Sequence, residues 1–320
     1  MPERLIERGI GETRAALVEE GRIIEARIML DGIVPAGTVV GARLASVGVN
    51  GRNAIARGDE GTEYLLPHAP RGITEGAALN IQITREAIPG NEAWKRPLAR
   101  ATDASPSSAP ILEGQRVPFP SPGNDRLEAA GWSDLLEEAA SGIVEFPGGR
   151  LRISPTPAMV LIDVDGTLPA DDLAVAGARA AGQAIRRLGL AGSIGIDLPT
   201  VEGKAARQAA AAAIDAVLPQ PFERTAVNGF GFVQIIRPRS RASLVEIYAG
   251  DRAGAEARAL LRRTASETGA RRLVAHPAVI AVLECHSDWT EALAAQIGGS
   301  VGLRADPSLG MGAGHAEPFA

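Results

Sequence analysis

Two apolar runs that each close on an aspartate constrain the fold of this chain most strongly. The first, "AMVLIDVD", ends on Asp163 and Asp165, and the second, "GSIGID", ends on Asp197. The segment between them reads as a helix through Arg187, and Gly189 is suited to end it. Strand, helix and strand in this order predict a right-handed crossover between parallel strands. Both strands then deliver their aspartates to the same C-terminal edge of one sheet, where sites form in such sheets.

The sequence around these runs continues as alternating helices and strands. "NDRLEAAGWSDLLEEAASG" predicts a helix, "GIVEFPGGRLRIS" a hairpin, and "GKAARQAAAAAIDAVL" a second helix, while "GFGFVQIIR" and "SLVEIYA" predict strands. Further on, the pattern predicts a helix, a strand at "RRLVAH", more helices and a short strand at "SVGLRA". We therefore expect an α/β domain over residues 126–250 and a small α/β domain over residues 251–320.

The N-terminal third has a different pattern. Residues 12–88 alternate like short strands, with glycine-rich turns at 48–51 and 58–61. Strands at this spacing indicate a small antiparallel barrel, with an OB-like fold as the first candidate. Residues 101–125 contain five prolines and four serines, which predicts a mobile linker. The expected order is N-terminal strands at 1–35, the barrel at 36–100 and the linker at 101–125, within an α+β protein.

Composition limits the class of function. The N-terminus is charged from its third residue, and no run approaches the roughly 18 apolar residues of a membrane span, so we expect a cytoplasmic protein without a membrane partner. The one cysteine, Cys285, excludes an internal disulfide and a thiolate zinc cluster within one chain. The net charge of -5 requires that any binding to nucleic acid use a local basic stripe.

The aspartates predict a metal site. Carboxylates at the ends of neighbouring buried strands repel one another, and a shared cation explains their placement most simply. Magnesium prefers one or two carboxylates together with waters and phosphate oxygens. Asp163 and Asp197 can therefore hold one Mg²⁺, with Asp165 as a third ligand or as a support for the other two. The other interpretation is that each aspartate only caps a helix or a turn; two of them on adjacent strands favour the ion.

A candidate basic stripe lies in "NGFGFVQIIRPRSRASL". Arg237, Arg239 and Arg241 recur at every second position, so in an extended segment they share one face and can follow a phosphate backbone. Pro238 confines this segment to a sheet edge or a loop. A solvated edge strand protected by charge explains the same pattern equally well.

Read alone, "DVDGT" at 163–167 resembles the first motif of the haloacid-dehalogenase phosphatases. In that family Asp163 would attack phosphorus and Asp165 would act as acid and base, with a later acidic pair for which Asp251 and Glu256 are available. The family places a tight turn and a hairpin flap directly after its motif, whereas here a helix follows within a few residues. It also has no use for Asp197. The phosphatase is therefore an alternative and not the first interpretation.

Taken in order, the segments resemble the ribonuclease E/G family. "EFPGGRLRISPTPAMVLIDVDG" is similar to the family's hairpin and following strand, "GLAGSIGIDL" to its second aspartate strand, and "GFGFVQIIRPRSRASL" to its Phe-Gly segment with two arginines. "ETRAALVEEGRIIEARI" resembles the opening strands, and residues 36–98 resemble the inserted OB-fold RNA-binding domain. The resemblance covers most of the chain, and it rests on the order of the motifs more than on any one of them.

This resemblance implies a DNase I-like catalytic region with a mixed sheet over residues 126–250. It implies a magnesium-dependent endoribonuclease that cleaves single-stranded RNA in RNA processing, including that of ribosomal RNA, or in decay. Asp163 and Asp197 fall on the family's magnesium-binding aspartates, and Asp165 falls on its supporting asparagine. The implied reaction is metal-assisted hydrolysis that leaves a 5′-phosphate and a 3′-hydroxyl. RNA contacts are implied for the arginine stripe and for Phe230 and Phe232.

The chain also departs from the family. The interval that holds the family's pocket for a 5′-monophosphate is short here, so we expect no sensing of the 5′ end. The family's zinc-binding cysteines are absent, so no zinc-bridged dimer is expected, although residues 253–305 resemble its dimerising domain and imply a homodimer.

The RNA-binding surface of the barrel departs as well. Two base-stacking aromatics of the family map to Ile55 and Leu65, and a basic residue maps to Glu92. Stacking would then have to come from Tyr64 or Trp94. These losses, together with the acidic balance of the chain, support a second hypothesis, namely an RNA-binding relative with little or no catalysis.

Overall fold

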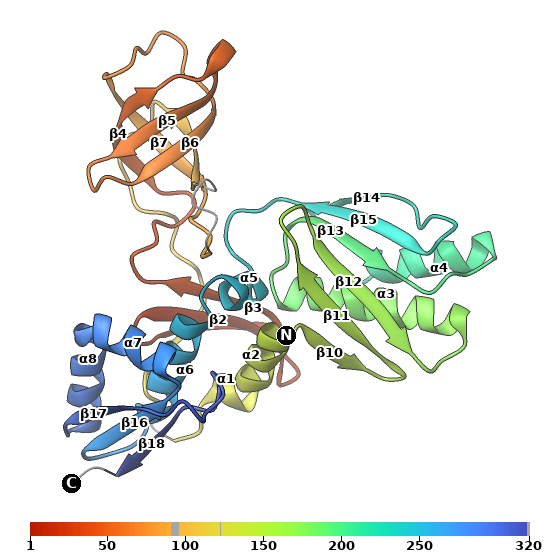
Figure 1. Ribbon diagram of the computed structural model, residues 1–320. Coiled ribbons are helices and arrows are strands. Elements are labelled where there is room, and N and C mark those ends of the chain that lie inside the picture. The colour runs from red at the N-terminus through yellow and green to blue at the C-terminus, as the bar shows by residue number, and fades with distance from the viewer. Residues whose placement is uncertain (91–95, 122, 319–320) are drawn as a thin grey trace.

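The computed structural model describes residues 1–90, 96–121 and 123–318. The protein is of mixed α+β type, and its described strands form three open sheets and one closed barrel (Figure 1). The barrel stands apart at one end, and the N-terminal sheet lies where the barrel, the six-stranded sheet and the C-terminal part come together. Among the described residues, no helix combines the length and the apolar character that a membrane crossing requires.

The N-terminal sheet is a meander of three antiparallel strands that a fourth strand extends. Its order is β3-β2-β1-β9, made of β1 (Glu3–Arg8), β2 (Glu12–Glu19), β3 (Arg22–Leu30) and β9 (Gln115–Val117). Strand β9 pairs in parallel with β1, and it lies inside the segment expected to be a mobile linker. That expectation is wrong for Gln115–Val117, because these residues pair with β1 at the edge of the sheet.

The barrel contains five strands in the closed order β4-β5-β6-β8-β7. They are β4 (Val39–Ser46), β5 (Arg52–Gly58), β6 (Glu63–His68), β7 (Ala78–Arg85) and β8 (Leu98–Thr102), with a short 3₁₀ turn η1 (Val49–Gly51) before β5. Four of these strands, β4 to β7, lie within residues 12–88, where the sequence predicts short strands. The sequence pattern missed β8, which closes the barrel by pairing antiparallel with β7 and parallel with β6.

The aspartate runs lie in the six-stranded sheet, whose order is β10-β11-β12-β13-β15-β14. Its strands are β10 (Ile143–Phe146), β11 (Gly149–Pro155), β12 (Val160–Gly166), β13 (Gly192–Asp197), β14 (Glu223–Arg224) and β15 (Phe232–Arg237). The pair β12 and β13 is parallel and the other neighbours are antiparallel, so the predicted parallel pairing in a mixed sheet is confirmed.

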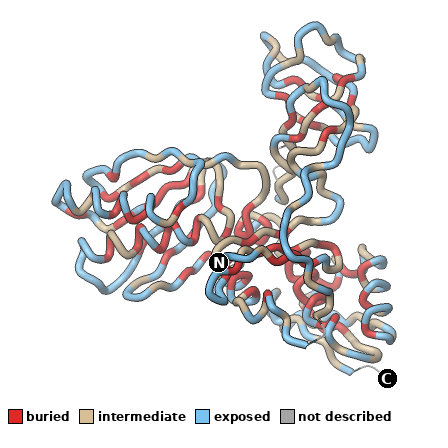
Figure 2. The backbone as a smooth tube through the Cα atoms, turned by 180° about the vertical axis from the view of Figure 1, so that it is seen from behind, coloured by how far each residue is buried: buried red, intermediate tan, exposed pale blue. Residues whose placement is uncertain are grey.

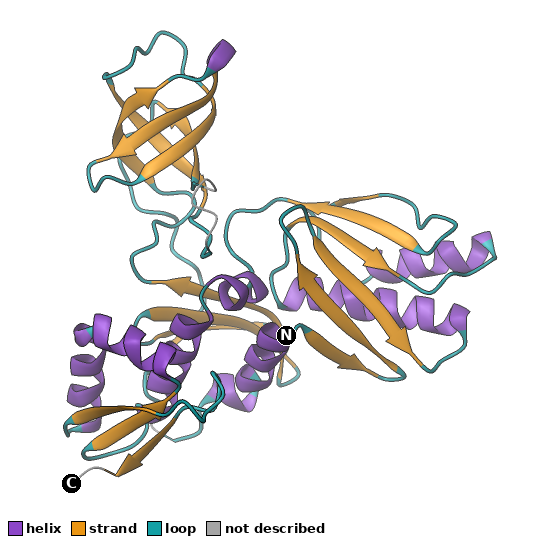
Figure 3. Cartoon of the chain, in the orientation of Figure 1, coloured by secondary structure: helices purple, strands orange, loops and turns teal. Residues whose placement is uncertain are grey.

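Two helices, α3 (Ala170–Arg187) and α4 (Lys204–Asp215), lie along one face of this sheet (Figure 3). Buried and more exposed positions alternate along β10, β11, β12 and β15 (Figure 2). In β12, Val160, Ile162 and Val164 point into the core, because side chains of a strand alternate between faces. Gly177 lets α3 approach closely, since a Cβ atom there would lie 2.3 Å from Cγ1 of Val164. The other face of the sheet, here called the open face, carries the intervening residues.

Helix α5 (Leu244–Gly250) corrects a prediction, because its sequence "SLVEIYA" was expected to be a strand. Ser243 and Glu246 form a capping box, in which Ser243 Oγ accepts from the Glu246 amide at 3.2 Å and Glu246 Oε2 accepts from the Ser243 amide at 2.8 Å. Leu244, Ile247 and Tyr248 are buried at helical spacing. A short apolar run fits either period, and here the cap decides for a helix.

The remaining helices and strands form the C-terminal part and its link to the N-terminal sheet. They are α1 (Arg126–Ala129), α2 (Trp132–Ser141), α6 (Arg252–Thr264), β16 (Arg271–Ala275), α7 (Pro277–Cys285), α8 (Ser287–Ile297), β17 (Val301–Ala305) and β18 (His315–Pro318). The C-terminal sheet has the order β17-β16-β18. Strand β18 was not predicted, and it joins the sheet antiparallel to β16.

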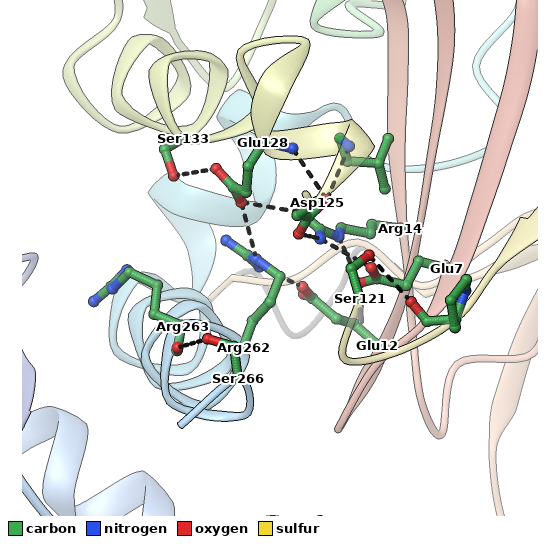
Figure 4. Close-up of polar contacts among 12 residues, drawn as sticks. Glu7, Glu12, Arg14, Ser121, Asp125, Glu128, Ser133, Arg262, Arg263 and Ser266 are labelled. Atoms are coloured by element: carbon green, nitrogen blue, oxygen red, sulfur yellow. Dashed lines mark hydrogen bonds and ion pairs between the residues drawn. The ribbon is translucent and has the colours of Figure 1, made fainter. Parts of the chain in front are cut away.

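A buried ion network joins the N-terminal sheet to α1 (Figure 4). The side chain of Arg14 is only 1% exposed, and its guanidinium contacts Glu7 at 2.7 Å, Asp125 at 2.5 Å and Glu128 at 3.0 Å. Asp125 also caps α1 by accepting from the backbone amides of residues 127 and 128. One arginine thus connects strands β1 and β2 to the helix that follows the Pro-rich segment.

A second set of ion pairs joins the same sheet to α6. Glu12 of β2 contacts Arg262 at 3.0 Å and Arg258 at 3.3 Å, and all three side chains are buried. Arg262 Nε also lies 3.6 Å from Glu128, so the two sets of ion pairs form one network. Charge pairing therefore holds the C-terminal part against the N-terminal sheet.

Candidate active site on the open sheet face

The structure brings together the two aspartates that the sequence singles out. Asp163 of β12 is the direct register partner of Asp197 of β13. Neighbouring strands lie about 4.8 Å apart, and both side chains are exposed on the open face. Asp165 lies two residues further along β12 on the same face. Two carboxylates therefore stand side by side, with a third next to them.

None of these aspartates has the structural role that the alternative interpretation gave it. The N-cap residue of α3 is Pro169, so the helix after β12 is not capped by Asp163 or Asp165. Across the described parts of the chain, the carboxylates of Asp163, Asp165 and Asp197 form no hydrogen bond and no ion pair. Carboxylates without partners on adjacent strands are available to a cation.

The pair does not form a complete protein cage for a metal. The described ranges contain no group of three or more Asp, Glu, His or Cys residues arranged to hold an ion. Asp165 therefore stands beside the pair and is not a third ligand within it. Magnesium accepts such a site, because it commonly keeps several waters and uses one or two carboxylates together with substrate phosphates.

Two arginines that the sequence analysis did not single out lie beside the aspartates. In the antiparallel pairing of β11 with β12, Arg152 is the partner of Asp163 and Arg150 is the partner of Asp165. Both arginines are exposed on the open face, and within the described residues neither forms a hydrogen bond or an ion pair. The signal for them was present, since "GRLRIS" alternates charged and apolar residues along a predicted strand.

An aromatic pair borders the same site. Phe232 is the register partner of Asp197, and its ring covers Gly195, where an added Cβ atom would lie 2.6 Å from the ring. Phe230 is 82% exposed in the turn before β15. The Asn228 side chain shapes this turn by accepting from the amides of Phe230 and Phe232 at 2.9 and 3.0 Å. Phe230 therefore presents an exposed ring in the turn that leads into β15, whose first residue, Phe232, is the register partner of Asp197.

The predicted arginine stripe does not lie on one face. Strand β15 ends at Arg237, whose Nη1 donates to the Leu190 carbonyl at 2.9 Å. Arg239 pairs with Glu246 at the start of α5, in a different cavity from the one that Arg237 and Arg241 line. The strict alternation fails because the chain leaves the strand after Arg237 and turns towards α5.

The barrel offers less for RNA than the resemblance implies. Tyr64 is 3% exposed and packs inside the barrel, so the expectation that its ring stacks on a base is wrong for this conformation. Ile55 and Leu65 form a cross-strand pair, half-buried on the outer surface. Trp94 and Glu92 fall within residues 91–95, which lie outside the described residues.

Comparison with known proteins does not add a family. No protein-family model and no curated protein matches the chain.

Proposed function

We propose that the protein is a magnesium-dependent endoribonuclease similar to the ribonuclease E/G family, acting on single-stranded RNA in the cytoplasm. The observation that carries this proposal is the register of Asp163 with Asp197 on an open sheet face, where neither carboxylate has a partner among the described residues. The proposal includes an OB-like role for the barrel in RNA binding and a DNase I-like arrangement for the six-stranded sheet. It also includes a homodimer through residues 253–305, without a zinc bridge.

Each group of residues on the open face would have a separate role in phosphodiester hydrolysis. Asp163 and Asp197 would hold Mg²⁺, which when bound supplies an activated water and steadies charge on phosphorus. Asp165 adds negative charge beside the pair and can orient water by accepting a hydrogen bond. Arg150 and Arg152 stand one strand away and can bind non-bridging phosphate oxygens, since guanidinium groups match phosphate in geometry and charge.

The aromatic residues would fix the RNA chain relative to the carboxylates. The exposed ring of Phe230 can stack on a base, which gives affinity without strong sequence preference. Gly195 has no side chain, which leaves room for the ring of Phe232 to lie against the sheet. The scissile phosphate could then approach from the solvent side of the sheet, where none of the described helices covers β12 and β13 (Figure 1).

A cleavage assay tests the proposal. A fluorescent single-stranded RNA is incubated with Mg²⁺ and either the wild-type protein or Asp197→Asn, which keeps the shape of the side chain but removes a charged ligand. We expect cleavage to fall by about 100-fold or more, as for the loss of a group that stabilises the transition state. Equal cleavage by the two proteins would remove the nuclease assignment.

The second candidate is an RNA-binding relative without catalysis. It is favoured by Asp165 in the asparagine position and by the lack of a third protein ligand among the described residues. RNA binding by the wild type with no Mg²⁺-dependent cleavage would support it. The phosphatase is less well supported, because Asp251 caps α6 and contacts Arg258 at 3.8 Å, whereas Asp197 occupies the place beside Asp163.

A further inference from the structure

A second group of arginines surrounds a cavity far from the aspartate pair. This cavity, here called the basic cavity, has a volume of about 330 Å³ and lies between β3, the end of α3 and the segment that follows β15. Figure 1 shows this segment running from the six-stranded sheet towards the N-terminal sheet. The charged residues that line the basic cavity are Glu25, Arg186, Arg237 and Arg241.

The basic cavity is separate from the candidate active site. Arg237 pairs in register with Gly192 at the start of β13, whereas Asp197 ends that strand. Five residues of strand separate the two points, which corresponds to about 17 Å. Arg237 also belongs to the set of alternate β15 positions whose members, Val233 and Ile235, face the helices. A ligand in the basic cavity would therefore not touch the carboxylates on the open face.

Arginines outnumber carboxylates among the residues that line the basic cavity. Glu25 pairs with Arg186 at 2.8 Å, which leaves Arg237 and Arg241 without a carboxylate partner among the residues described. Arg27, on the same face of β3 as Glu25, makes its one hydrogen bond to the sulfur of Met29, and its buried Nε has no partner within the described structure.

The arginines respond to one another electrostatically. Burial and the nearby Arg241 lower the pKa of Arg27 to about 10, while the nearby Glu86 opposes them. Burial also lowers the pKa of Arg237, with Arg241 and Arg186 acting in the same direction and Glu25 opposing them. Like charges disfavour the charged form, and a bound anion would reverse that effect.

Arg241 has the greatest freedom to bind a ligand. Its guanidinium forms no hydrogen bond and no ion pair in the described ranges, so its N–H donors are available. Arg237 uses Nη1 for the Leu190 carbonyl and retains its other donors for the cavity. Planar guanidinium groups at a concave site match the oxygens of a phosphate group, which they bind in pairs of hydrogen bonds.

We propose that the basic cavity binds a phosphate group through Arg241 and Arg237, carried either by an RNA strand or by free phosphate or a nucleotide. Its volume lies within the range of small-molecule sites, so there is room for a phosphate together with part of the group that carries it. The proposal does not depend on the nuclease assignment, because binding at this site requires no cleavage.

The first test measures the binding of inorganic phosphate by calorimetry without Mg²⁺, with a chelator present and ionic strength held constant with sodium chloride. We expect Arg241→Gln to weaken phosphate binding by about tenfold or more, as for the loss of charge-assisted hydrogen bonds. Arg179→Gln is the matched control. It removes the same charge, but Arg179 is exposed on α3 and lies outside the cavity. Phosphate binding that is absent from the wild type, or equal in wild type and Arg241→Gln, would overturn the proposal.

A second arm identifies the source of the phosphate. The affinity of a single-stranded RNA is measured at several salt concentrations, again without Mg²⁺. If the RNA backbone occupies the basic cavity, Arg241→Gln lowers the slope of log affinity against log salt by about one. An unchanged RNA slope together with weakened phosphate binding assigns the cavity to free phosphate or a nucleotide.

A conservative variant separates charge from geometry. Arg241→Lys keeps the positive charge but loses the planar fork, so we expect phosphate affinity between those of wild type and Arg241→Gln. Arg241 forms no hydrogen bond within the described residues, so both variants should fold, and their circular dichroism checks this. If Arg241→Lys binds phosphate no better than Arg241→Gln, the fork geometry carries the site; if neither variant differs from wild type, Arg241 has no part in it.

Discussion

Replacing Arg14 by methionine should destabilise the protein more than any other single charge removal around α1. The variant Arg14→Met keeps the volume of the side chain but leaves Glu7, 1% exposed, without its cation. Removing one partner of a buried ion pair costs about 3 to 5 kcal/mol. Asp125 and Glu128 also lose a partner, but their side chains are 26% and 34% exposed, so water can solvate them and each adds less than about 1 kcal/mol.

The cost of Arg14→Met should depend on pH. Burial raises the pKa of Glu7 above its ordinary value of 4.5, while Arg14 opposes that rise. Removing Arg14 therefore raises the pKa of Glu7 further in the folded state. An acid whose pKa is higher in the folded than in the unfolded state contributes stability at pH values below the unfolded pKa, and that contribution is lost as the pH rises through the folded pKa. The destabilisation should thus be smallest below pH 4.5 and should grow as the pH rises through the raised folded pKa of Glu7.

Denaturant unfolding followed by tryptophan fluorescence measures this effect. Trp132 is fully buried and lies 5.3 Å from the Arg14 guanidinium, so its emission reports on the network. The matched control is Arg126→Met, which breaks an exposed pair with Glu3 and should cost less than about 1 kcal/mol. Adding Glu7→Gln to Arg14→Met should recover at least about 2 kcal/mol, because the unpaired buried charge is gone. Equal losses of stability for Arg14→Met and Arg126→Met, or no recovery in the double variant, would show that the buried pair of Arg14 with Glu7 does not set the stability of this region.

Three further substitutions test the site and the fold. Phe230→Ala should weaken RNA binding by about 1 to 3 kcal/mol, which a fluorescence-anisotropy titration measures. The unfolding midpoint should not change, because the ring is 82% exposed, and thermal unfolding checks this. Arg152→Gln should lower RNA cleavage by about 100-fold and leave RNA affinity within a few-fold, because its role lies beside Asp163 at the reacting phosphate; single-turnover kinetics distinguish the two effects. Ser243→Ala should destabilise the protein by about 1 kcal/mol, because α5 loses its capping box, and denaturant unfolding measures this loss. Ser243→Asp can still cap the helix and should keep the stability of the wild type.

The carboxylate pair could be predicted because it depends on local pattern alone. Alternation fixes which side chains of β12 face the helices, and the crossover through α3 makes β13 its parallel neighbour. Because both strands are short and each carries its aspartate near its C-terminal end, Asp163 and Asp197 become register partners. Helix α5 could not be predicted in the same way, because its apolar run satisfies both periods and only the reciprocal bonds of Ser243 and Glu246 decide between them.

Strands β8 and β18 escaped prediction for another reason. Each is short, and each is defined mainly by the strand it pairs with: β8 bridges β6 and β7, and β18 lies against β16. Leu98–Thr102 has one buried position in five, so its sequence has no clear alternation. Such strands form because a neighbouring strand offers an edge to pair with. This depends on tertiary structure, so local sequence pattern does not predict it.

The arginines show how far sequence pattern reaches towards function. Alternation would place Arg150 and Arg152 on the open face with the aspartates, since β11 remains a regular strand across them. The same alternation misplaces Arg239, because β15 ends at Arg237 and the chain then turns towards α5. Arg241 returns to the cavity wall that Arg237 lines, where fewer carboxylates than arginines face it. The number of unpaired guanidinium groups at a site thus depends on where a strand ends, and this separates a solvated charged edge from a phosphate site more surely than the spacing of arginines does.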